Sequence, residues 1–395
     1  MLNPVVNAPA AFHLLAKPSG AICNLDCSYC FFLAKDQLYP GSDFRMSSST
    51  LENYLRQLLE AHRTPEVTVA WQGGEPTLMG LDFFERAVEL VGQLARPGQR
   101  IEHTIQTNAT LIDDAWAEFL LAHDFLVGVS VDGPREMHDA YRVDKGGKPT
   151  FDRVIAGLDR LKAHGVRWNA LTTVNRANED HGRVVYHFLR DELAAQHIQF
   201  IPIVERNSPG GIPIGNQVTD RSVSPEGYGR FLMDVFDEWM ISDVGTVFVQ
   251  MFDTTLANTM HVPGAVCVHA ETCGRSLALE HNGDVYSCDH FVDPEYLLGN
   301  IAEQHLLTMV ASPQQVEFGL AKRDELPRQC LSCEVRTLCN GGCPKDRFEI
   351  SAAGDPGLNY LCPSYLAFFN HVSKPMQRMA QLIHAGGFAD QIMAE

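Results

Sequence analysis

Apolar and polar residues alternate with two different periods through the first half of the chain. Short apolar runs typical of buried strands occur at His13–Lys17, Val67–Gln72, Ile101–Gln106, Leu126–Val131, Trp168–Val174 and His197–Ile203. Between them, apolar residues recur with the spacing of amphipathic helices, several of which begin at a capping Ser or Asp, over Ser49–His62, Asp82–Ala95, Asp113–Ala122, Phe151–His164 and Asp180–Leu193. This alternation predicts a parallel sheet, either doubly wound or curled into a full or partial barrel.

Polar motifs follow three of the predicted strands. Gln72-Gly73-Gly74-Glu75-Pro76 follows the second strand, Gln106-Thr107-Asn108 ends the third, and Ser130-Val131-Asp132-Gly133 ends the fourth. Because parallel α/β folds bind ligands at the carboxyl ends of their strands, we expect the chemistry of this protein to lie there.

The second half has a different pattern. A stretch rich in Pro, Gly, Ser and Asn over Glu205–Val223 predicts a lid or linker, and an apolar helix follows over Pro225–Met240. From about Val266 the chain holds short strands, turns and cysteines, including a hairpin pattern around Asn282-Gly283. A closing helix is expected over Ser364–Ala385.

Composition and charge exclude several classes of protein. The 395 residues predict two or three domains, and no apolar stretch is long enough to cross a membrane. The formal charge of −18 and the absence of a basic run argue against nucleic acid as a partner. Met1–Ala11 lacks the layout of a secretory signal, so we expect a cytoplasmic protein with no membrane partner.

Eleven cysteines point to metal chemistry, since the number is odd and thiols stay reduced in the cytoplasm. Cys23-x3-Cys27-x2-Cys30 offers three thiolates, one fewer than a closed zinc site or 4Fe-4S cluster needs. Two interpretations follow. Either one metal ion of a cluster keeps a free position for another ligand, or a distant His completes a zinc site. The others follow residue 266, at Cys267, Cys273, Cys288, Cys330, Cys333, Cys339, Cys343 and Cys362. Eight thiolates suffice for two complete 4Fe-4S clusters, while Cys330–Cys343 alone would also suit a zinc ribbon.

The first triad, with Tyr29 before its last cysteine and Gly73-Gly74-Glu75-Pro76 downstream, resembles the radical S-adenosylmethionine (SAM) enzymes. The resemblance implies an α/β partial (β/α)6 barrel in which Cys23, Cys27 and Cys30 hold a 4Fe-4S cluster whose fourth iron binds SAM. The SAM contacts that it implies are Tyr29, Gly73, Gly74, Glu75, Ser130, Asp132, Arg142 and the backbone of Val204. From the residues alone, the two glycines and Asp132 also suit ordinary turns, Arg142 a solvated surface charge, and Val204 core packing.

The late cysteines resemble the SPASM extension of radical enzymes that modify peptides and proteins. By this resemblance, a first auxiliary 4Fe-4S cluster is held by Cys267, Cys273, Cys288 and Cys343, and a second by Cys330, Cys333, Cys339 and Cys362. Three clusters then account for every cysteine. The predicted organisation is an N-terminal extension (1–10), a radical SAM barrel with a connecting helix (11–240), a SPASM domain (241–365) and a C-terminal helix (366–395).

Further motifs narrow the resemblance to the anaerobic sulfatase-maturating enzymes, from about Phe12 to Tyr365. They are the segments 72–77, 106–112, 129–134 and Tyr286-Ser287-Cys288-Asp289-His290. The family implies oxidation of an active-site cysteine or serine of a sulfatase to Cα-formylglycine, with Asp289 as the catalytic base. It implies an unfolded sulfatase or peptide with a Cys/Ser-x-Pro/Ala-x-Arg motif as substrate, and flavodoxin or ferredoxin as electron donor. The chain departs from the family at Phe32, where some members have tyrosine, and over Glu205–Val223.

Two other functions stay open at the level of sequence. A radical SAM/SPASM enzyme could instead install a thioether or carbon-carbon crosslink in a ribosomal peptide, and only Asp289 and the strand-end motifs speak against this. A non-catalytic iron-sulfur or zinc protein is the other alternative. The three-thiolate triad argues against it, because an electron carrier gains nothing from an open iron. Whether the target is cysteine or serine, which sulfatase is the partner, and the oligomeric state are left open.

Overall fold

The computed structural model describes residues 8–207, 216–262 and 266–395. Contacts within the chain divide it into two compact units. The first comprises Met1–Ser130, Arg142–Trp168 and Gly274–Leu320, and the second comprises Val131–Tyr141, Asn169–Cys273 and Ala321–Glu395. Among the described helices, none is long and apolar enough to cross a membrane. Most of the predicted N-terminal extension lies outside the described residues.

A sheet of seven strands forms the first unit, in the order β10-β9-β8-β1-β2-β3-β4. The strands are β1 (His13–Ala16), β2 (Glu66–Trp71), β3 (Arg100–Thr107), β4 (Leu126–Ser130), β8 (Ser276–Leu279), β9 (Asp284–Tyr286) and β10 (Leu297–Asn300). Strands β1 to β4 are parallel, as predicted. The predicted hairpin forms β8 and β9, and β8 pairs in parallel with β1, placing Leu14 opposite Leu277. The late hairpin therefore extends the sheet of the N-terminal strands.

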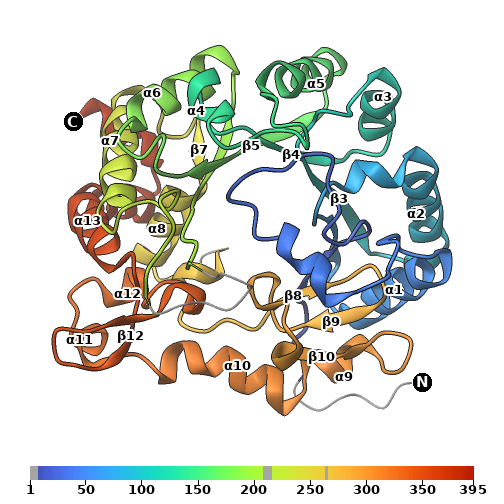
Figure 1. Cartoon of the computed structure of the whole chain (residues 1–395). Coiled ribbons are helices and arrows are strands. Elements are labelled where there is room, and N and C mark those ends of the chain that lie inside the picture. The colour runs from blue at the N-terminus through green and yellow to red at the C-terminus, as the bar shows by residue number, and fades with distance from the viewer. Residues whose placement is uncertain (1–7, 208–215, 263–265) are drawn as a thin grey trace. The chain divides into compact units, whose positions relative to one another are not determined.

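Amphipathic helices cover the outer side of β1 to β4 (Figure 1). They are α1 (Ser48–Ala61), α2 (Leu81–Leu94), α3 (Asp114–Ala122) and α5 (Phe151–His164), and the short α9 (Leu306–Val310) packs on α1. Ser47 caps α1 by accepting a hydrogen bond from the Thr50 amide, and Asp113 caps α3 through the Trp116 amide. The predicted Ser and Asp signals therefore mark the observed helix starts to within two residues.

The second unit holds the parallel strands β5 (Arg167–Val174, from Asn169 on), β6 (His197–Pro202) and β7 (Phe248–Val249). Its helices are α4 (Arg135–Asp139), α6 (Gly182–His187), α7 (Gly227–Ser242), α8 (Gln250–Thr259), α11 (Arg328–Leu331), α12 (Arg336–Cys339) and α13 (Cys362–His384), and β11 (Glu349–Ile350) pairs with β12 (Pro356–Leu358). Helix α10 (Pro313–Asp324) begins in the first unit and ends in the second.

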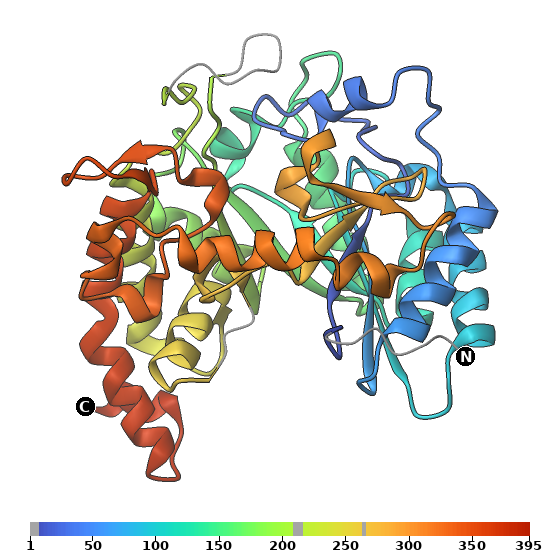
Figure 2. The same cartoon turned by 90° about the horizontal axis from the view of Figure 1, so that it is seen from below.

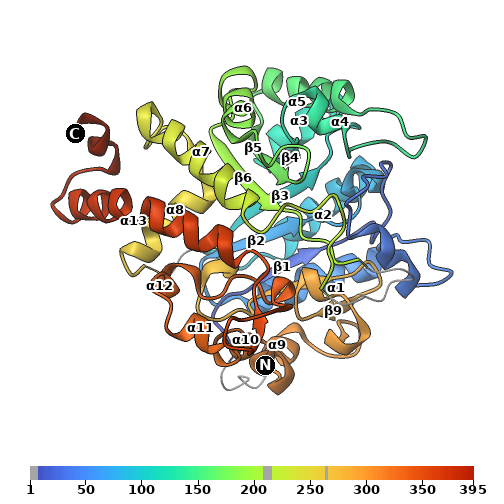
Figure 3. The same ribbon diagram turned by 60° about the vertical axis from the view of Figure 1, so that its left-hand side comes forward.

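Helix α13 packs along α7 and α8 (Figure 3). In Figure 2 it is the long red ribbon leading to the C-terminus, where the turn Ala389–Ala394 folds back beside it. Gly229 of α7 permits this packing, because a Cβ there would lie 2.7 Å from the backbone of Ser364. The Ser364 hydroxyl accepts a hydrogen bond from the Gly229 amide at 2.8 Å. The closing helix predicted over Ser364–Ala385 is confirmed, with its start two residues earlier, at Cys362.

The sequence pattern located all six predicted strands but missed several later elements. Strand β7 and helices α8 and α10 were not predicted, because β7 is two residues long and α10 has weak amphipathic character. The α-helix predicted over Asp180–Leu193 is shorter than expected, because α6 spans only Gly182–His187. A π-helical turn follows it over Phe188–Glu192.

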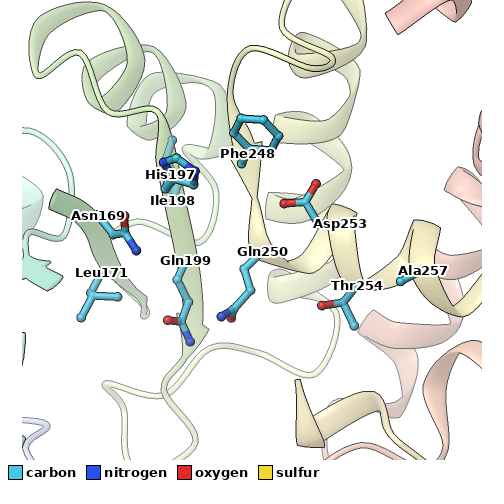
Figure 4. Close-up of a pocket in the computed structure, with 10 residues that line it drawn as sticks. All are labelled: Asn169, Leu171, His197, Ile198, Gln199, Phe248, Gln250, Asp253, Thr254 and Ala257. Carbon is cyan, nitrogen blue, oxygen red and sulfur yellow. The ribbon is translucent and has the colours of Figure 1, made fainter. Parts of the chain in front are cut away.

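A pocket of about 440 Å³ lies at the amino-terminal ends of β5 and β6, beside β7 and α8. Figure 4 shows Gln199 and Gln250 on facing sides of it, with Asn169 and Asp253 nearby. The sequence motifs follow the carboxyl ends of strands, so this pocket is separate from the predicted SAM contacts.

Candidate active site

The N-terminal cysteine triad lies in the loop that follows β1. Cys23, Cys27 and Cys30 are each partly buried, and none of the eleven cysteines, all of which are described, is disulfide-bonded. Cys23 Sγ accepts hydrogen bonds from the Leu25 amide at 3.3 Å and from Asn108 Nδ2 at 3.6 Å. Burial raises the pKa of Cys23 to about 12, and Glu75, Cys27 and Cys30 add to the rise. The triad thiols are therefore close to one another, and cluster binding must displace their protons.

Two glycines hold this loop against the end of β2. The Gly74 amide donates to the Gly20 carbonyl at 2.8 Å, and the Glu75 amide donates to the Ile22 carbonyl at 2.9 Å. A Cβ on Gly74 would lie 2.0 Å from the Ile22 oxygen, and Gly73 has a φ of 114°, which favours glycine. The motif therefore positions the cysteine loop, whatever contact it makes with SAM.

Glu75 is fully buried and joins the ends of β2 and β3. Its carboxylate accepts hydrogen bonds from the Thr77 amide (3.1 Å) and hydroxyl (2.6 Å), the Thr107 hydroxyl (2.8 Å) and the Asn108 amide (2.8 Å). Burial raises the pKa of Glu75, and these donors oppose the rise. Four donors occupy the carboxylate, so Glu75 acts as a brace for the strand ends. Asn108 belongs to the predicted strand-end motif Gln106-Thr107-Asn108 but was given no role of its own, and it links this brace to Cys23.

Tyr29 and Arg142 lie together beside the triad. The Arg142 guanidinium is 5.6 Å from the centre of the Tyr29 ring. Arg142 is only 8% exposed, so the alternative of a solvated surface charge is wrong. Burial raises the pKa of Cys30, and Arg142 is among the groups that oppose this rise. A buried cation next to Cys30 is suited to hold a carboxylate at that position.

The other predicted SAM contacts follow strands, as expected. Ser130 is the last residue of β4, and Val204 follows β6 by two residues. Asp132 is fully buried in the second unit, where its Oδ1 accepts a hydrogen bond from the Thr173 amide at 2.9 Å and its carbonyl one from Asn178 Nδ2 at 3.1 Å. These bonds give Asp132 a structural role at the end of β5.

Asp289 follows β9 in the first unit and lies against a buried lysine. Lys17 Nζ is 2.7 Å from Asp289 Oδ1 and 3.1 Å from Glu280 Oε1, and lies 4.9 Å from the centre of the Phe32 ring. Burial works to lower the pKa of Lys17, but the attraction of Asp289 and Glu280 outweighs it, so the pKa is raised. Lys17 and Glu280 were missed by sequence reasoning. The one sequence feature that could have pointed to this pair is the charged residue at the end of each of two apolar runs, Lys17 after β1 and Glu280 after β8.

Aromatic rings connect Asp289 to the triad loop. Phe31 follows Cys30 directly, and its ring lies 4.1 Å from that of Phe32 and 5.3 Å from that of His290, measured between centres. Phe31 remains 41% exposed. The cysteine loop and the candidate base therefore share one end of the first unit's sheet.

Four late cysteines gather in the second unit. Burial raises the pKa of Cys339 to about 12, and Cys362, Cys330 and Cys333 add to the rise. Cys330 lies in α11, Cys333 in the turn between α11 and α12, Cys339 at the end of α12 and Cys362 at the start of α13. They are the set that the resemblance assigns to the second auxiliary cluster. Among the described residues, no three His, Cys, Asp or Glu side chains converge on one ion. This is compatible with a cluster, in which each thiolate binds its own iron.

Three of the other four late cysteines also belong to the second unit. Burial raises the pKa of Cys343 to about 12, and Cys267 is among the groups that add to the rise. Cys273 and Cys267 both act electrostatically on Lys322. Cys288, the remaining member of the first auxiliary set, belongs to the first unit.

Comparison with known proteins defines the class. Residues 18–189 match the Radical SAM superfamily, and residues 267–334 match the SPASM iron-sulfur cluster-binding domain. Together with the parallel sheet and the cysteine triad, these matches define a radical SAM enzyme with a SPASM domain, which confirms the predicted fold class.

Relatives place the chain more closely. The serine-type anaerobic sulfatase-maturating enzyme of Bacteroides thetaiotaomicron is 45% identical over 377 residues, covering 93% of this chain and 91% of that protein. The cysteine-type enzyme of Clostridium perfringens is 32% identical over 365 residues, covering 91% and 95%. The solved structure of native anSMEcpe with bound AdoMet matches with a TM-score of 0.84 and 31% identity, covering 93% of this chain and 99% of that chain. The chain belongs to the family of anaerobic sulfatase-maturating enzymes, as the motifs predicted.

Proposed function

We propose that this enzyme oxidises a serine or cysteine side chain of a sulfatase to Cα-formylglycine without oxygen, with Asp289 as the base. The observation that carries the proposal is the buried Asp289 carboxylate, held by Lys17 at 2.7 Å at the end of the sheet that bears the cysteine triad. Oxidation of a hydroxyl- or thiol-bearing carbon requires a proton acceptor beside it. The 45% identity to a serine-type enzyme favours serine as the first target to test.

The proposed cofactors are SAM and three 4Fe-4S clusters with the ligand sets given above. When bound, these groups supply the 5′-deoxyadenosyl radical that takes a hydrogen atom from the target Cβ, and the acceptor for the remaining electron. Asp289 accepts the proton of the target hydroxyl or thiol, and Lys17 holds this carboxylate in place. Arg142 and Tyr29 are suited to the carboxylate end of SAM, while Gly73, Gly74 and Glu75 fix the loop that carries the triad.

The proposed substrate is an unfolded chain with a Cys/Ser-x-Pro/Ala-x-Arg motif. A solved structure of anSMEcpe contains AdoMet together with the Cp18Cys peptide, and matches this chain with a TM-score of 0.84. We place the reaction in the cytoplasm, before the sulfatase is exported, with flavodoxin or ferredoxin as electron donor. The domain boundaries predicted above belong to the same proposal.

Anaerobic incubation with SAM, a reductant and a motif peptide tests the function. Paired peptides that differ only in Ser or Cys at the target position, and a third with Ala, separate the two targets from background. We expect the serine peptide to lose two hydrogen atoms, the cysteine peptide to exchange sulfur for oxygen as well, and the alanine peptide to stay unchanged. A crosslinked product, or 5′-deoxyadenosine with neither aldehyde, would contradict the proposal.

A further inference from the structure

The cysteine-rich part of the second unit contains a buried lysine that forms no ion pair with any carboxylate in the described part of the chain. Lys322, near the end of α10, is 1% exposed. Its Nζ donates hydrogen bonds to the carbonyl oxygens of Cys267 and Val268, each at 3.0 Å, and to that of Ala270. Three acceptors match the three protons of an ammonium group, so the geometry favours the charged form.

A second cation, Arg347, lies next to Lys322. Its guanidinium donates to the Lys322 carbonyl at 2.6 Å, the Asn340 carbonyl at 2.8 Å and the Gly341 carbonyl at 2.9 Å. The nearby buried Asp346 has its own partner, because Lys345 Nζ lies 2.8 Å from its Oδ1. Backbone oxygens therefore solvate both cations without neutralising them.

The groups that oppose the fall in pKa of this pair are cysteines, whose thiols become anionic when a cluster displaces their protons. Burial and, to a smaller extent, Arg347 lower the pKa of Lys322 to about 8, and Cys273, Cys267 and Cys343 oppose the fall. For Arg347, burial lowers the pKa and the opposing thiols are Cys330, Cys343, Cys339 and Cys273. Lys322 is hydrogen-bonded to Cys267, a member of the first auxiliary set. Arg347 donates to the carbonyls of Asn340 and Gly341, which lie in the chain between Cys339 of the second set and Cys343 of the first.

We infer that Lys322 and Arg347 are the fixed counter-charges that set the reduction potentials of the auxiliary clusters, Lys322 for the first cluster and Arg347 for both. This inference rests on the cluster assignment in the proposed function. Reduction adds a negative charge to a cluster, and a buried cation stabilises that charge strongly because the surroundings screen it little. With two cations nearby, the first cluster has the higher potential of the two. Cys288, a proposed ligand of the first auxiliary cluster, directly precedes the proposed base Asp289 in the chain. The proposed acceptor of the electron and the proposed acceptor of the proton therefore involve adjacent residues.

Redox titration of the reconstituted holoenzyme, followed by electron paramagnetic resonance, tests the inference. Addition of SAM identifies the step of the triad cluster, and the other two steps belong to the auxiliary clusters. In Lys322→Met we expect one auxiliary step to fall, so that its reduced-to-oxidised ratio at fixed potential drops about tenfold, or about 59 mV for one electron. The other auxiliary step stays in place. Lys322→Arg keeps the charge and should restore the wild-type value.

Lys374→Met is the matched control, because it removes an exposed lysine from α13 in the same unit. Its potentials should equal those of the wild type, since solvent screens that charge. If Lys322→Met loses iron, Arg347→Gln provides the second test, and both auxiliary steps must then fall.

Unmoved steps in an iron-replete Lys322→Met or Arg347→Gln protein would overturn the inference, as would an equal shift in Lys374→Met. The proposed cofactor set fails separately, if the wild type shows fewer than three steps or far less than about twelve irons per chain.

Discussion

Two buried lysines, one in each unit, have opposite surroundings. Lys17 and Lys322 are each 1% exposed. Lys17 lies between two carboxylates, Asp289 at 2.7 Å and Glu280 at 3.1 Å, and its pKa is raised because their attraction outweighs burial. Lys322 is surrounded by carbonyl oxygens, and burial with Arg347 lowers its pKa to about 8.

The difference shows which parts of the active site the polypeptide completes by itself. The ammonium of Lys17 is paired with two carboxylates of the same chain. The charge of Lys17 is therefore balanced before any cofactor binds. Buried charges are tolerated only when they are paired, and Lys322 with Arg347 has no paired carboxylate among the contacts described. In the proposed function, the two cations of the second unit favour an anionic cluster beside them, whereas Asp289 is already paired with Lys17.

The largest effect is expected from removal of the cysteine triad, the proposed source of the radical. Replacing Cys23, Cys27 and Cys30 by alanine should abolish SAM cleavage and leave roughly two thirds of the iron, the share of the two auxiliary clusters. Anaerobic iron analysis and 5′-deoxyadenosine assay measure both quantities. SAM cleavage at the wild-type level in this variant would show that the triad does not hold the cluster that cleaves SAM.

Asp289→Asn tests the base site next. The amide keeps the shape of the side chain but cannot accept the substrate proton, so formylglycine production should fall by about 10²- to 10⁴-fold. SAM cleavage and iron content should persist. Mass spectrometry of the peptide and 5′-deoxyadenosine assay separate the two steps. A wild-type yield of formylglycine at full iron content would place the base elsewhere.

Lys17→Met should destabilise the protein more than the removal of a more exposed lysine would, because it leaves Glu280 and Asp289 buried together. Loss of one partner from a buried ion pair costs about 3–5 kcal/mol of unfolding free energy. The pKa of Lys17 is raised, so in the wild type this stabilisation is complete below the ordinary lysine pKa and is lost only as pH rises through the raised value.

Anaerobic denaturant unfolding of Lys17→Met and of the control Lys35→Met measures this difference. Lys35 pairs with Asp293 at 3.3 Å at a more exposed position, so its loss should cost about 1 kcal/mol or less. Equal losses of unfolding free energy in the two variants would show that the buried ion pairs of Lys17 contribute no more to stability than the exposed pair of Lys35.

The smallest expected effect concerns Phe32. Its ring lies 4.9 Å from Lys17 Nζ, and a cation–π contact of this kind contributes about 0.5–2 kcal/mol. Phe32→Leu should lower the unfolding free energy by about this amount beyond its change in packing, while Phe32→Tyr, which keeps the ring, should lower it less. Unfolding of the two variants side by side provides the comparison, and a larger loss in Phe32→Tyr would contradict the contact.

Local signals in the sequence located the main elements of the fold because their causes are local. Ser47 and Asp113 cap the helices that follow them, and the apolar runs at β1 to β6 became strands within one residue or so of their predicted ends. The π turn after α6 escaped prediction, since its apolar spacing is that of a continuing helix. Gly74 was singled out as a SAM contact, whereas the structure shows that a Cβ at this position would lie closest to the Ile22 carbonyl. Sequence spacing carries no information about that neighbour.

The sequence by itself determined the parallel sheet, the separation of an early cysteine triad from eight late cysteines and the membership of a radical enzyme family, because periodicity and motif spacing are properties of neighbouring residues. Only the tertiary structure decided that Lys17 lies against Asp289. That contact depends on the parallel pairing of β8 with β1, which joins the late hairpin to the N-terminal strands within the first unit's sheet. The same holds for Lys322 and the Cys267 loop. Long-range register is set by packing of the whole sheet, so residues far apart in the chain acquire their charge partners only when it folds.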